Sequence, residues 1–287
     1  MRIALLTCAA LVAFAANSLL NRAAIAEAGA DPAVFTGLRL VSGAVTLAAL
    51  VTLRQGAAGL RGAGSWPSAA ALAVYAVAFS FAYVRLDAGL GALVLFGTVQ
   101  VVMFGGALAR GQQPGRWRWL GSALGIGGLS VLFLPGAAQP ATPGVLLMMI
   151  AGAAWGVYSL RGQAAGDPLV DTAGNFLWAA PVGVLLMLPM LWLGWPSGGA
   201  VLLAVASGAV ASGLGYAVWY AVLPRLEPSL AAIAQLTVPL IALSGGVLLL
   251  GEAVTWAFAL AACLILGGVA LAIYDPTLGG RAAARGR

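Results

Sequence analysis

The stretch PSLAAIAQLTVPLIALSGGVLLLGE, residues 228–252, is long and apolar enough to cross a bilayer, yet polar residues and a proline interrupt it. Gln235, Thr237 and Pro239 lie near its middle. A similar stretch, AGLGALVLFGTVQVVMFGGALARGQ, occupies residues 88–112, which is 140 residues earlier. Two such copies indicate that the chain contains a duplicated membrane-spanning unit.

The composition places the whole chain in the membrane class. Of the 287 residues, 62% are hydrophobic and 8% are charged, and the mean hydropathy is +1.01. Soluble domains carry about 25% charged residues, so this chain could not cover a water-facing surface. The sequence has no histidine, two isolated cysteines and only eight carboxylates, which argues against a metal site, a disulfide framework and most acid/base enzymes. We therefore expect no enzymatic activity, no catalytic residues, no cofactor, no metal and no nucleic-acid partner.

Apolar runs of membrane-spanning length recur ten times. A bilayer core of about 30 Å needs about 20 apolar residues of helix. The runs fall at 3–21, 32–53, 66–84, 88–109, 117–134, 143–161, 171–194, 198–223, 229–250 and 254–274. The first run has the basic start and small residues of a signal peptide, but its removal would leave an odd number of spans, so we interpret it as a helix. The sequence therefore predicts an all-α integral membrane protein with ten transmembrane helices.

The arginines predict the orientation of these helices. If the N-terminus faces the cytoplasm, eleven of the fourteen arginines fall on that side, and only Arg22 and Arg85 fall on the other. This asymmetry follows the positive-inside rule. We therefore expect both termini in the cytoplasm, with the tail at 276–287 acting as a basic topology signal.

The two halves of the chain match at specific positions. At an offset of 140, Arg85-Leu86-Asp87 aligns with Arg225-Leu226-Glu227, and a Gly-Gly pair at 105 aligns with one at 245. Shared apolar composition would not readily align these features, so we predict a five-helix unit at 1–136 and its repeat at 137–275. Because five is odd, the second unit is inverted. Many secondary transporters are built from inverted repeats, with the substrate site between them near the midplane.

The second repeat carries a distinctive series of features between residues 223 and 273. They are a short loop, Ser-Leu-Ala-Ala, a mid-helix proline, a Gly-Glu pair and a last helix with Gly-Gly. This series resembles the EamA repeat of the drug/metabolite transporter superfamily. In the first copy Val99 replaces the proline and Gln112 the glutamate. The resemblance implies a ten-helix metabolite exporter of the bacterial inner membrane, most similar to the bacterial aromatic amino-acid exporters.

We expect a substrate cavity lined by amides and aromatic rings. Pro239 lacks an N–H, so the helix bond to the carbonyl of Gln235 cannot form, and backbone groups freed inside a membrane need a partner. Gln100 places a second amide near the same depth in the other repeat. The full set of predicted cavity residues is Asn17, Tyr75, Phe79, Tyr83, Phe96, Gln100, Trp155, Tyr158, Tyr216, Trp219, Gln235 and Pro239. The alternative is that the amides link neighbouring helices and the rings pack or face lipid.

Arg39 is the one charge predicted to lie inside a span. We expect it to snorkel to the outer interface, and contact with a substrate carboxylate is the alternative. Small residues on the fifth and tenth helices predict that these two helices pack tightly within one chain: Gly121, Gly125, Gly127, Gly128, Gly267 and Gly268. We therefore expect a monomer, with a homodimer through this face as the alternative.

The expected function is alternating-access export through this cavity. No carboxylate is predicted at mid-depth, so neither a cation carrier nor a proton-coupled pump is favoured. We expect neutral or zwitterionic metabolites to move by facilitated diffusion or exchange, with aromatic and other large neutral amino acids as the best candidates. The alternatives are export of other metabolites or drugs, and a lipid flippase or scramblase.

Overall fold

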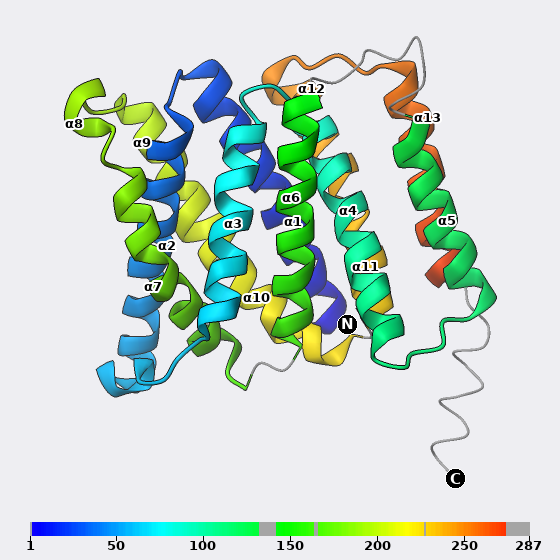
Figure 1. The fold of residues 1–287 in the computed structure, drawn as a ribbon, viewed down its shortest axis with the longest axis horizontal. Coiled ribbons are helices and arrows are strands. Elements are labelled where there is room, and N and C mark those ends of the chain that lie inside the picture. Colours follow the sequence, from blue (N-terminus) through cyan, green and yellow to red (C-terminus); the bar gives the residue numbers. More distant parts are fainter. Residues whose placement is uncertain (1, 132–141, 164–165, 227, 274–287) are drawn as a thin grey trace.

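The computed structural model describes residues 2–131, 142–163, 166–226 and 228–273, and helices make up most of these residues (Figure 1). The first half contains α1 (Arg2–Arg22), α2 (Pro32–Gln55), α3 (Trp66–Ala82), α4 (Ala88–Ala109) and α5 (Arg116–Val131). The second half contains α6 (Thr142–Gly162), α7 (Pro168–Leu186), α8 (Met190–Leu193), α9 (Gly198–Val205), α10 (Gly215–Val222), α11 (Pro228–Gln235), α12 (Val238–Leu250) and α13 (Trp256–Ile273). Two π-helical segments, η1 (Ala23–Glu27) and η3 (Ala206–Leu214), continue α1 and join α9 to α10.

The prediction of an all-α, multi-pass membrane protein is confirmed. All ten predicted spans are helical in the described residues. Six helical stretches in the described part are long and apolar enough to cross a membrane: Arg2–Glu27, Pro32–Gln55, Ala88–Ala109, Thr142–Gly162, Pro168–Leu193 and Gly198–Arg225. The other four spans are represented by shorter helices, namely α3, α5, the broken pair α11 and α12, and α13. The tail at 276–287 and the end of the span at 117–134 lie outside the described residues.

The second helix of each half begins with the same N-terminal cap, an aspartate followed by a proline. Asp31 precedes α2, and its carboxylate accepts hydrogen bonds from the N–H groups of the second and third helical residues. Asp167 does the same for α7. A proline follows each aspartate, at the first helical position, where no N–H is needed. The sequence thus starts both helices without leaving their first donors unsatisfied.

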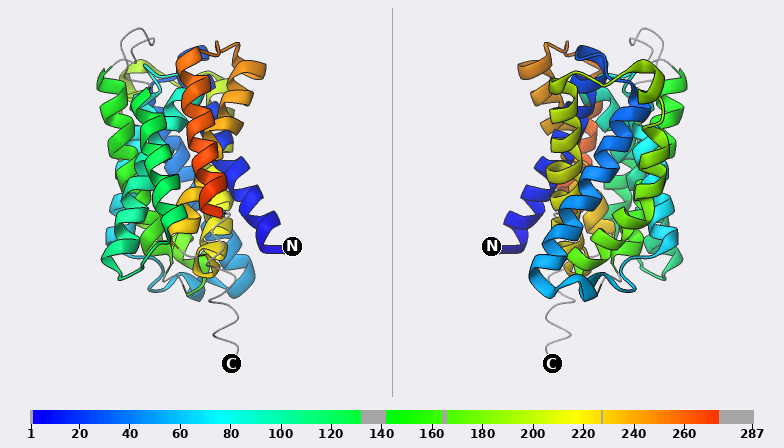
Figure 2. Two further views of the ribbon diagram at one scale, coloured as in Figure 1. Left: turned by 90° about the vertical axis from the view of Figure 1, so that its right-hand side faces the viewer. Right: turned by 90° about the vertical axis from the view of Figure 1, so that its left-hand side faces the viewer.

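The helices pack in pairs that relate one half to the other. Helix α2 packs against α7, and α5 packs against α13. The contact of α3 with α6 has its counterpart in the contact of α10 and η3 with α1. Each of these contacts joins a helix of the first half to a helix of the second, and the repeat bounds at 1–136 and 137–275 stay a prediction. Figure 2 shows that the first turns of α1 lean away from the other helices.

Glycines bring α5 and α13 into close contact at one side of the bundle (Figure 1). A Cβ on Gly268 would lie 2.4 Å from the carbonyl oxygen of Gly121, and one on Gly128 would lie 2.8 Å from that of Ala261. Such distances leave no room for a side chain. The predicted packing of these two helices within one chain is therefore confirmed. Gly127 and Gly267 do not take part, because a Cβ there would meet nothing within 4 Å, and Gly125 touches only Leu236.

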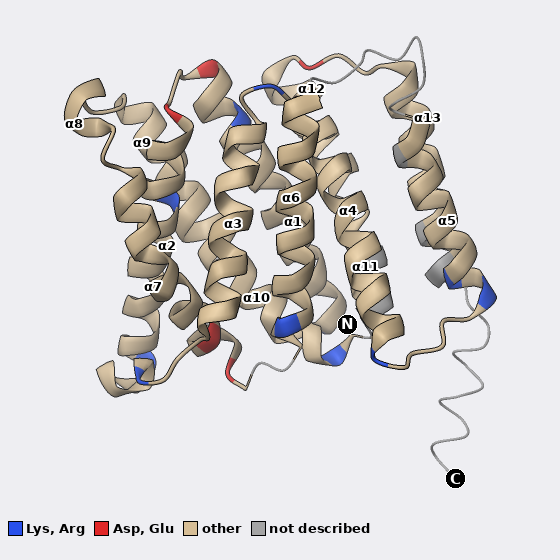
Figure 3. Ribbon diagram, in the orientation of Figure 1, with Lys and Arg blue, Asp and Glu red and all other residues tan. Residues whose placement is uncertain are grey.

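Most arginines gather at one end of the bundle, which we call the arginine-rich end (Figure 3). Helices α2, α4, α6 and α10 run toward this end, and α5 begins there. The arginines there are Arg54, Arg61, Arg110, Arg116, Arg118, Arg161 and Arg225. At the opposite end, Arg22 pairs with Asp87 at 3.2 Å.

Candidate functional site

Aromatic rings from α4, α6 and α10 meet around Phe14 of α1 and form what we call the central cluster. The ring of Phe14 lies 5.1 Å from that of Trp155, 5.4 Å from Trp219, 5.8 Å from Tyr216 and 6.2 Å from Phe96, measured between centroids. All five residues are buried. Sequence reasoning did not place Phe14 in the cavity set, although it faces Trp155.

Helix α3 adds three predicted residues to the central cluster. Tyr75 and Phe79 lie on one face of α3, Tyr83 directly follows its last residue, and consecutive rings are 5.2 and 4.8 Å apart. Tyr75 also lies 5.0 Å from Trp155. On α6, Tyr158 stacks on Trp155 at 5.4 Å. The spacing of four residues therefore places these rings together, as the helical period requires.

The guanidinium of Arg39 lies inside the central cluster. Its Nε donates to Ser212 Oγ at 2.9 Å, and its Nη2 donates to the hydroxyls of Tyr75 at 3.0 Å and Tyr216 at 2.7 Å. The guanidinium carbon lies 5.1 Å from the ring centroids of Tyr75 and Phe79. Arg39 is 1% exposed, so the expectation that it snorkels to the interface was wrong. The hydroxyls of Ser212, Tyr75 and Tyr216 accept its hydrogen bonds, and the ring faces of Tyr75 and Phe79 attract the cation.

The charge of Arg39 is not balanced by the described part of the chain. None of the described carboxylates forms an ion pair with it. Its Nη1 is buried and has no hydrogen-bond partner among the described residues. Moving an ion out of water costs on the order of several kcal/mol, even after the protein relaxes. The buried Nη1 of Arg39 therefore keeps an unused hydrogen-bond donor inside the central cluster.

Asn17 joins the polar part of the cluster to α1. Its Nδ2 donates to Ser212 Oγ at 3.0 Å and to Tyr216 OH at 2.8 Å, and its Oδ1 accepts from Ser207 Oγ at 2.5 Å. A Cβ on Gly208 would lie 2.2 Å from the carbonyl oxygen of Arg39. Only a glycine lets η3 approach α2 this closely.

Sequence reasoning missed both serines of this network. Ser207 and Ser212 are five residues apart, a spacing that puts them on different faces of an α-helix. They lie in η3, where the bonds run between residues five apart, so both reach Asn17. The available signal was the run of small residues ASGAVASGL at 206–214.

Gln235 lies beside the cluster at a break in its helix. The predicted break is present, because α11 ends at Gln235 and α12 begins at Val238, with Pro239 buried in its first turn. Gln235 Oε1 accepts from Trp155 Nε1 at 2.7 Å, and Nε2 lies 3.2 Å from Met103 Sδ. The amide therefore links three helices and orients the indole of Trp155.

Gln100 does not reach the central cluster. Its Nε2 donates to Ser122 Oγ at 3.0 Å. The residue lines a groove of about 290 Å³ between α4 and α5, together with Phe104 and Trp119. The position equivalent to Gln235 at the repeat offset is Leu95, and five residues of helix rotate a side chain by about 140°. Similar depth thus did not bring the two amides to one cavity.

The described carboxylates lie at the helix ends. At the end opposite the arginines, Glu252 accepts from the N–H groups of Ala88 at 2.7 Å and Gly89 at 3.3 Å, and lies 3.9 Å from Arg22. Burial raises the pKa of Glu252, although these donors oppose the shift. This contact ties the loop before α13 to the start of α4.

Comparison with known proteins identifies relatives of this chain. The family model of the EamA-like transporter family matches residues 142–274. An uncharacterized protein of Pseudomonas aeruginosa is 50% identical over 285 residues, which cover 99% of this chain and 98% of that protein. A solved crystal structure has a TM-score of 0.68 and 24% identity, and covers 92% of this chain and 97% of its own. At that identity, the structure shows a shared fold alone.

Proposed function

We propose that this chain, whose residues 142–274 match the EamA-like transporter family, a family of transporters and not of enzymes, exports aromatic and other large neutral amino acids by alternating access. The observation that carries this proposal is the unpaired Arg39 inside an aromatic cluster. A substrate carboxylate at Nη1 would supply the missing acceptor and the missing negative charge. Hydrogen bonds between ionised groups are roughly twice as strong as neutral ones.

The rest of the central cluster suits an aromatic amino acid. Trp155, Trp219 and Phe14 offer ring faces and edges to a substrate ring, and such aromatic pairs contribute about 0.5–1.5 kcal/mol each beyond the buried area. The faces of these rings also attract a substrate ammonium group. The substrate would displace part of this packing, since the rings are in contact with one another in the conformation described here.

The energetics favour facilitated diffusion or exchange. A proton-coupled transporter uses ionisable groups within the membrane, and no Asp or Glu in the described residues lies in the central cluster. We propose that the arginine-rich end faces the cytoplasm of a bacterium, with both termini on that side, because this places most arginines inside. We further propose a monomer, because the glycines of α5 and α13 are used within the chain.

A lipid flippase receives no support from the groove on the lipid-facing side. A groove of about 560 Å³ between α3, α6 and α7 is lined by apolar residues such as Trp66, Ala73, Phe81, Trp178 and Val182. It could hold an acyl chain, but it offers no polar side chain to a lipid headgroup. Other metabolites with a carboxylate and an apolar body remain the second candidate class, since Arg39 would bind them in the same way.

Uptake into liposomes tests this proposal. Purified protein is reconstituted, and uptake of labelled phenylalanine, tryptophan and methionine is measured with and without a pH gradient, beside empty liposomes. We expect saturable uptake that does not respond to the gradient. Stimulation by the gradient would contradict facilitated diffusion, and no uptake of any of the three would overturn the assignment of the substrate class.

A further inference from the structure

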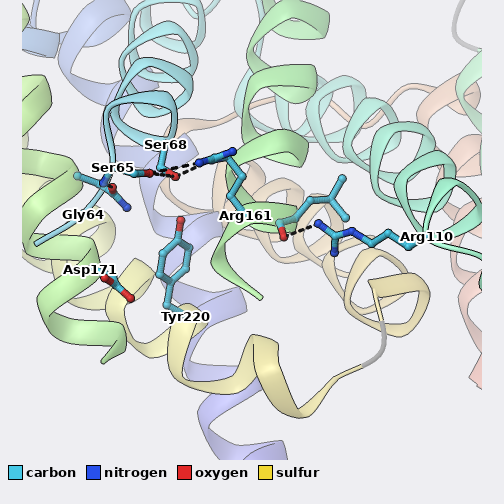
Figure 4. Close-up of a pocket in the computed structure, with 9 residues that line it drawn as sticks. Gly64, Ser65, Ser68, Arg110, Arg161, Asp171 and Tyr220 are labelled. Atoms are coloured by element: carbon cyan, nitrogen blue, oxygen red, sulfur yellow. Dashed lines mark hydrogen bonds between the residues drawn. The ribbon is translucent and has the colours of Figure 1, made fainter. Parts of the chain in front are cut away.

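A cavity opens at the arginine-rich end, apart from the central cluster (Figure 4). It has a volume of about 390 Å³, which lies in the range of small-molecule sites. Its lining comes from the start of α3, the ends of α4 and α6, the first turns of α7 and the end of α10. We call it the vestibule. Its charged residues are Arg110, Arg161 and Asp171.

The charges of the vestibule are held apart by neutral partners. Arg161 Nε donates to Ser68 Oγ at 2.9 Å, and its Nη2 donates to Ser65 Oγ at 3.4 Å. Arg110 donates to the carbonyl oxygen of Leu160 and to Gln163. Within the described residues, neither arginine forms an ion pair. Arg161 is thus turned into the vestibule by serines rather than extended toward lipid headgroups.

The vestibule also contains an unpaired carboxylate. Asp171 Oδ2 accepts a hydrogen bond from the N–H of Gly166 at 2.9 Å and makes no ion pair with an arginine of the described chain. Figure 4 shows Asp171 and Arg161 on different sides of the Tyr220 ring. Arg161 and Asp171 thus line one cavity without forming an ion pair with each other, and a ligand with one negative and one positive group could pair with both.

Backbone contacts fix the two sides of the vestibule relative to each other. A Cβ on Gly174 of α7 would lie 2.2 Å from the carbonyl carbon of Ala63, so the loop before α3 rests directly on α7. The N–H of Ser65 donates to Asn175 Oδ1 at 3.0 Å. The serines that hold Arg161 and the helix that carries Asp171 are therefore joined into one frame.

We propose that the vestibule is a loading site for zwitterionic α-amino acids, with Arg161 binding the carboxylate and Asp171 binding the ammonium group. The identity of the cargo rests on the proposed function. The vestibule supplies the negative partner for an ammonium group that the central cluster lacks. Selection of a zwitterion thus takes place here, before the substrate reaches Arg39.

Two stacked rings separate the vestibule from the central cluster. Tyr220 OH donates to the carbonyl oxygen of Tyr158 at 3.1 Å, and the two rings stack at 4.9 Å. Tyr158 in turn stacks on Trp155. Ring contacts therefore run without a gap from Tyr220, which lines the vestibule, to Trp155 in the central cluster.

Equilibrium binding to purified protein tests the proposal independently of transport. The background is Arg39→Gln, which removes the central charge and leaves the vestibule unchanged. We expect this variant to bind labelled phenylalanine, and the further change Arg161→Gln or Asp171→Asn to weaken binding at least roughly tenfold, since each removes a hydrogen bond between charged groups. The matched control is Arg225→Gln, which removes an arginine from the same end but outside the vestibule.

Competition by deaminated and decarboxylated analogues assigns the two charges. In the Arg39→Gln background, 3-phenylpropionate and phenethylamine should each compete at least roughly tenfold more weakly than phenylalanine. Asp171→Asn should abolish the discrimination against 3-phenylpropionate, and Arg161→Gln that against phenethylamine. All variants are checked for an unchanged elution profile.

The outcomes separate this proposal from the proposed function. No phenylalanine binding to Arg39→Gln, or equal effects of Arg161→Gln, Asp171→Asn and Arg225→Gln, would overturn the vestibule while wild-type transport could stand. Binding that depends on Arg161 and Asp171, without transport of phenylalanine by the wild type, would uphold the vestibule and overturn the proposed function.

Discussion

Replacing Arg39 with methionine should change folding stability and transport in opposite directions. Methionine has a similar length and no charge, so it removes a buried cation that no described carboxylate balances. The groups that lose Arg39 keep other partners, because Tyr216 OH donates to Tyr75 OH at 3.0 Å and Asn17 donates to both Ser212 and Tyr216. Removing an unbalanced buried ion relieves a desolvation penalty on the order of several kcal/mol, so the folded state of this variant should be at least as stable as that of the wild type.

The same substitution should impair substrate binding. A hydrogen bond to a charged group contributes about 1.5–3 kcal/mol, which corresponds to a roughly 10- to 150-fold loss of affinity for a carboxylate. We therefore expect Arg39→Met to melt at or above the wild-type temperature in detergent, and to lose most phenylalanine uptake in proteoliposomes. Arg39→Lys keeps the charge and serves as the control, with part of the uptake retained. A lower melting temperature for Arg39→Met together with wild-type uptake would show that Arg39 has a structural role alone.

Three further predictions concern the cluster, the helix pair and the far end of the bundle. Trp155→Phe keeps a ring in place but leaves Gln235 Oε1 without its indole donor. It should therefore lower the free energy of unfolding by about 1–3 kcal/mol and reduce phenylalanine uptake. Unchanged uptake would show that the indole is not part of the substrate site. Gly268→Ala should cost about 1–3 kcal/mol through overpacking and so lower the melting temperature. Gly267→Ala should leave the melting temperature unchanged, because its Cβ would meet nothing within 4 Å. Equal melting temperatures of the two variants would contradict the close packing. Burial raises the pKa of Glu252 above its ordinary value of 4.5, so the folded protein holds this proton more tightly than the unfolded chain does. The free energy of unfolding should then fall as pH rises through the raised pKa, and melting profiles of Glu252→Gln should lack this component.

Much of the fold could be predicted from the sequence because a bilayer imposes simple rules. The length of the apolar runs predicted the ten helical spans, and Pro239 predicted the break between α11 and α12. Within the spans, the sequence did not reveal where the helix changes its winding. The π-helical segment η3 has no charge or proline to mark it, and depends on which neighbours its small residues can approach.

The aromatic part of the site was predicted better than its polar part. Rings at helical spacing on α3 converge on Trp155, as periodicity requires. The direction of a single polar side chain depends on partners in other helices, and these cannot be read from its own segment. Arg39 turns inward because η3 and α10 supply acceptors, and Gln100 turns toward α5 because Ser122 does.

The glycine contact between α5 and α13 has a consequence for biosynthesis. Gly128 and Gly268 are 140 residues apart in the chain, so α5 enters the membrane long before its partner exists. At about 5–20 residues per second, the ribosome needs roughly 7 to 28 s to supply α13. During that interval the glycine face of α5 contacts lipid or the insertion machinery, and a chain arrested before residue 256 would be exposed to membrane quality control through this one unmatched helix.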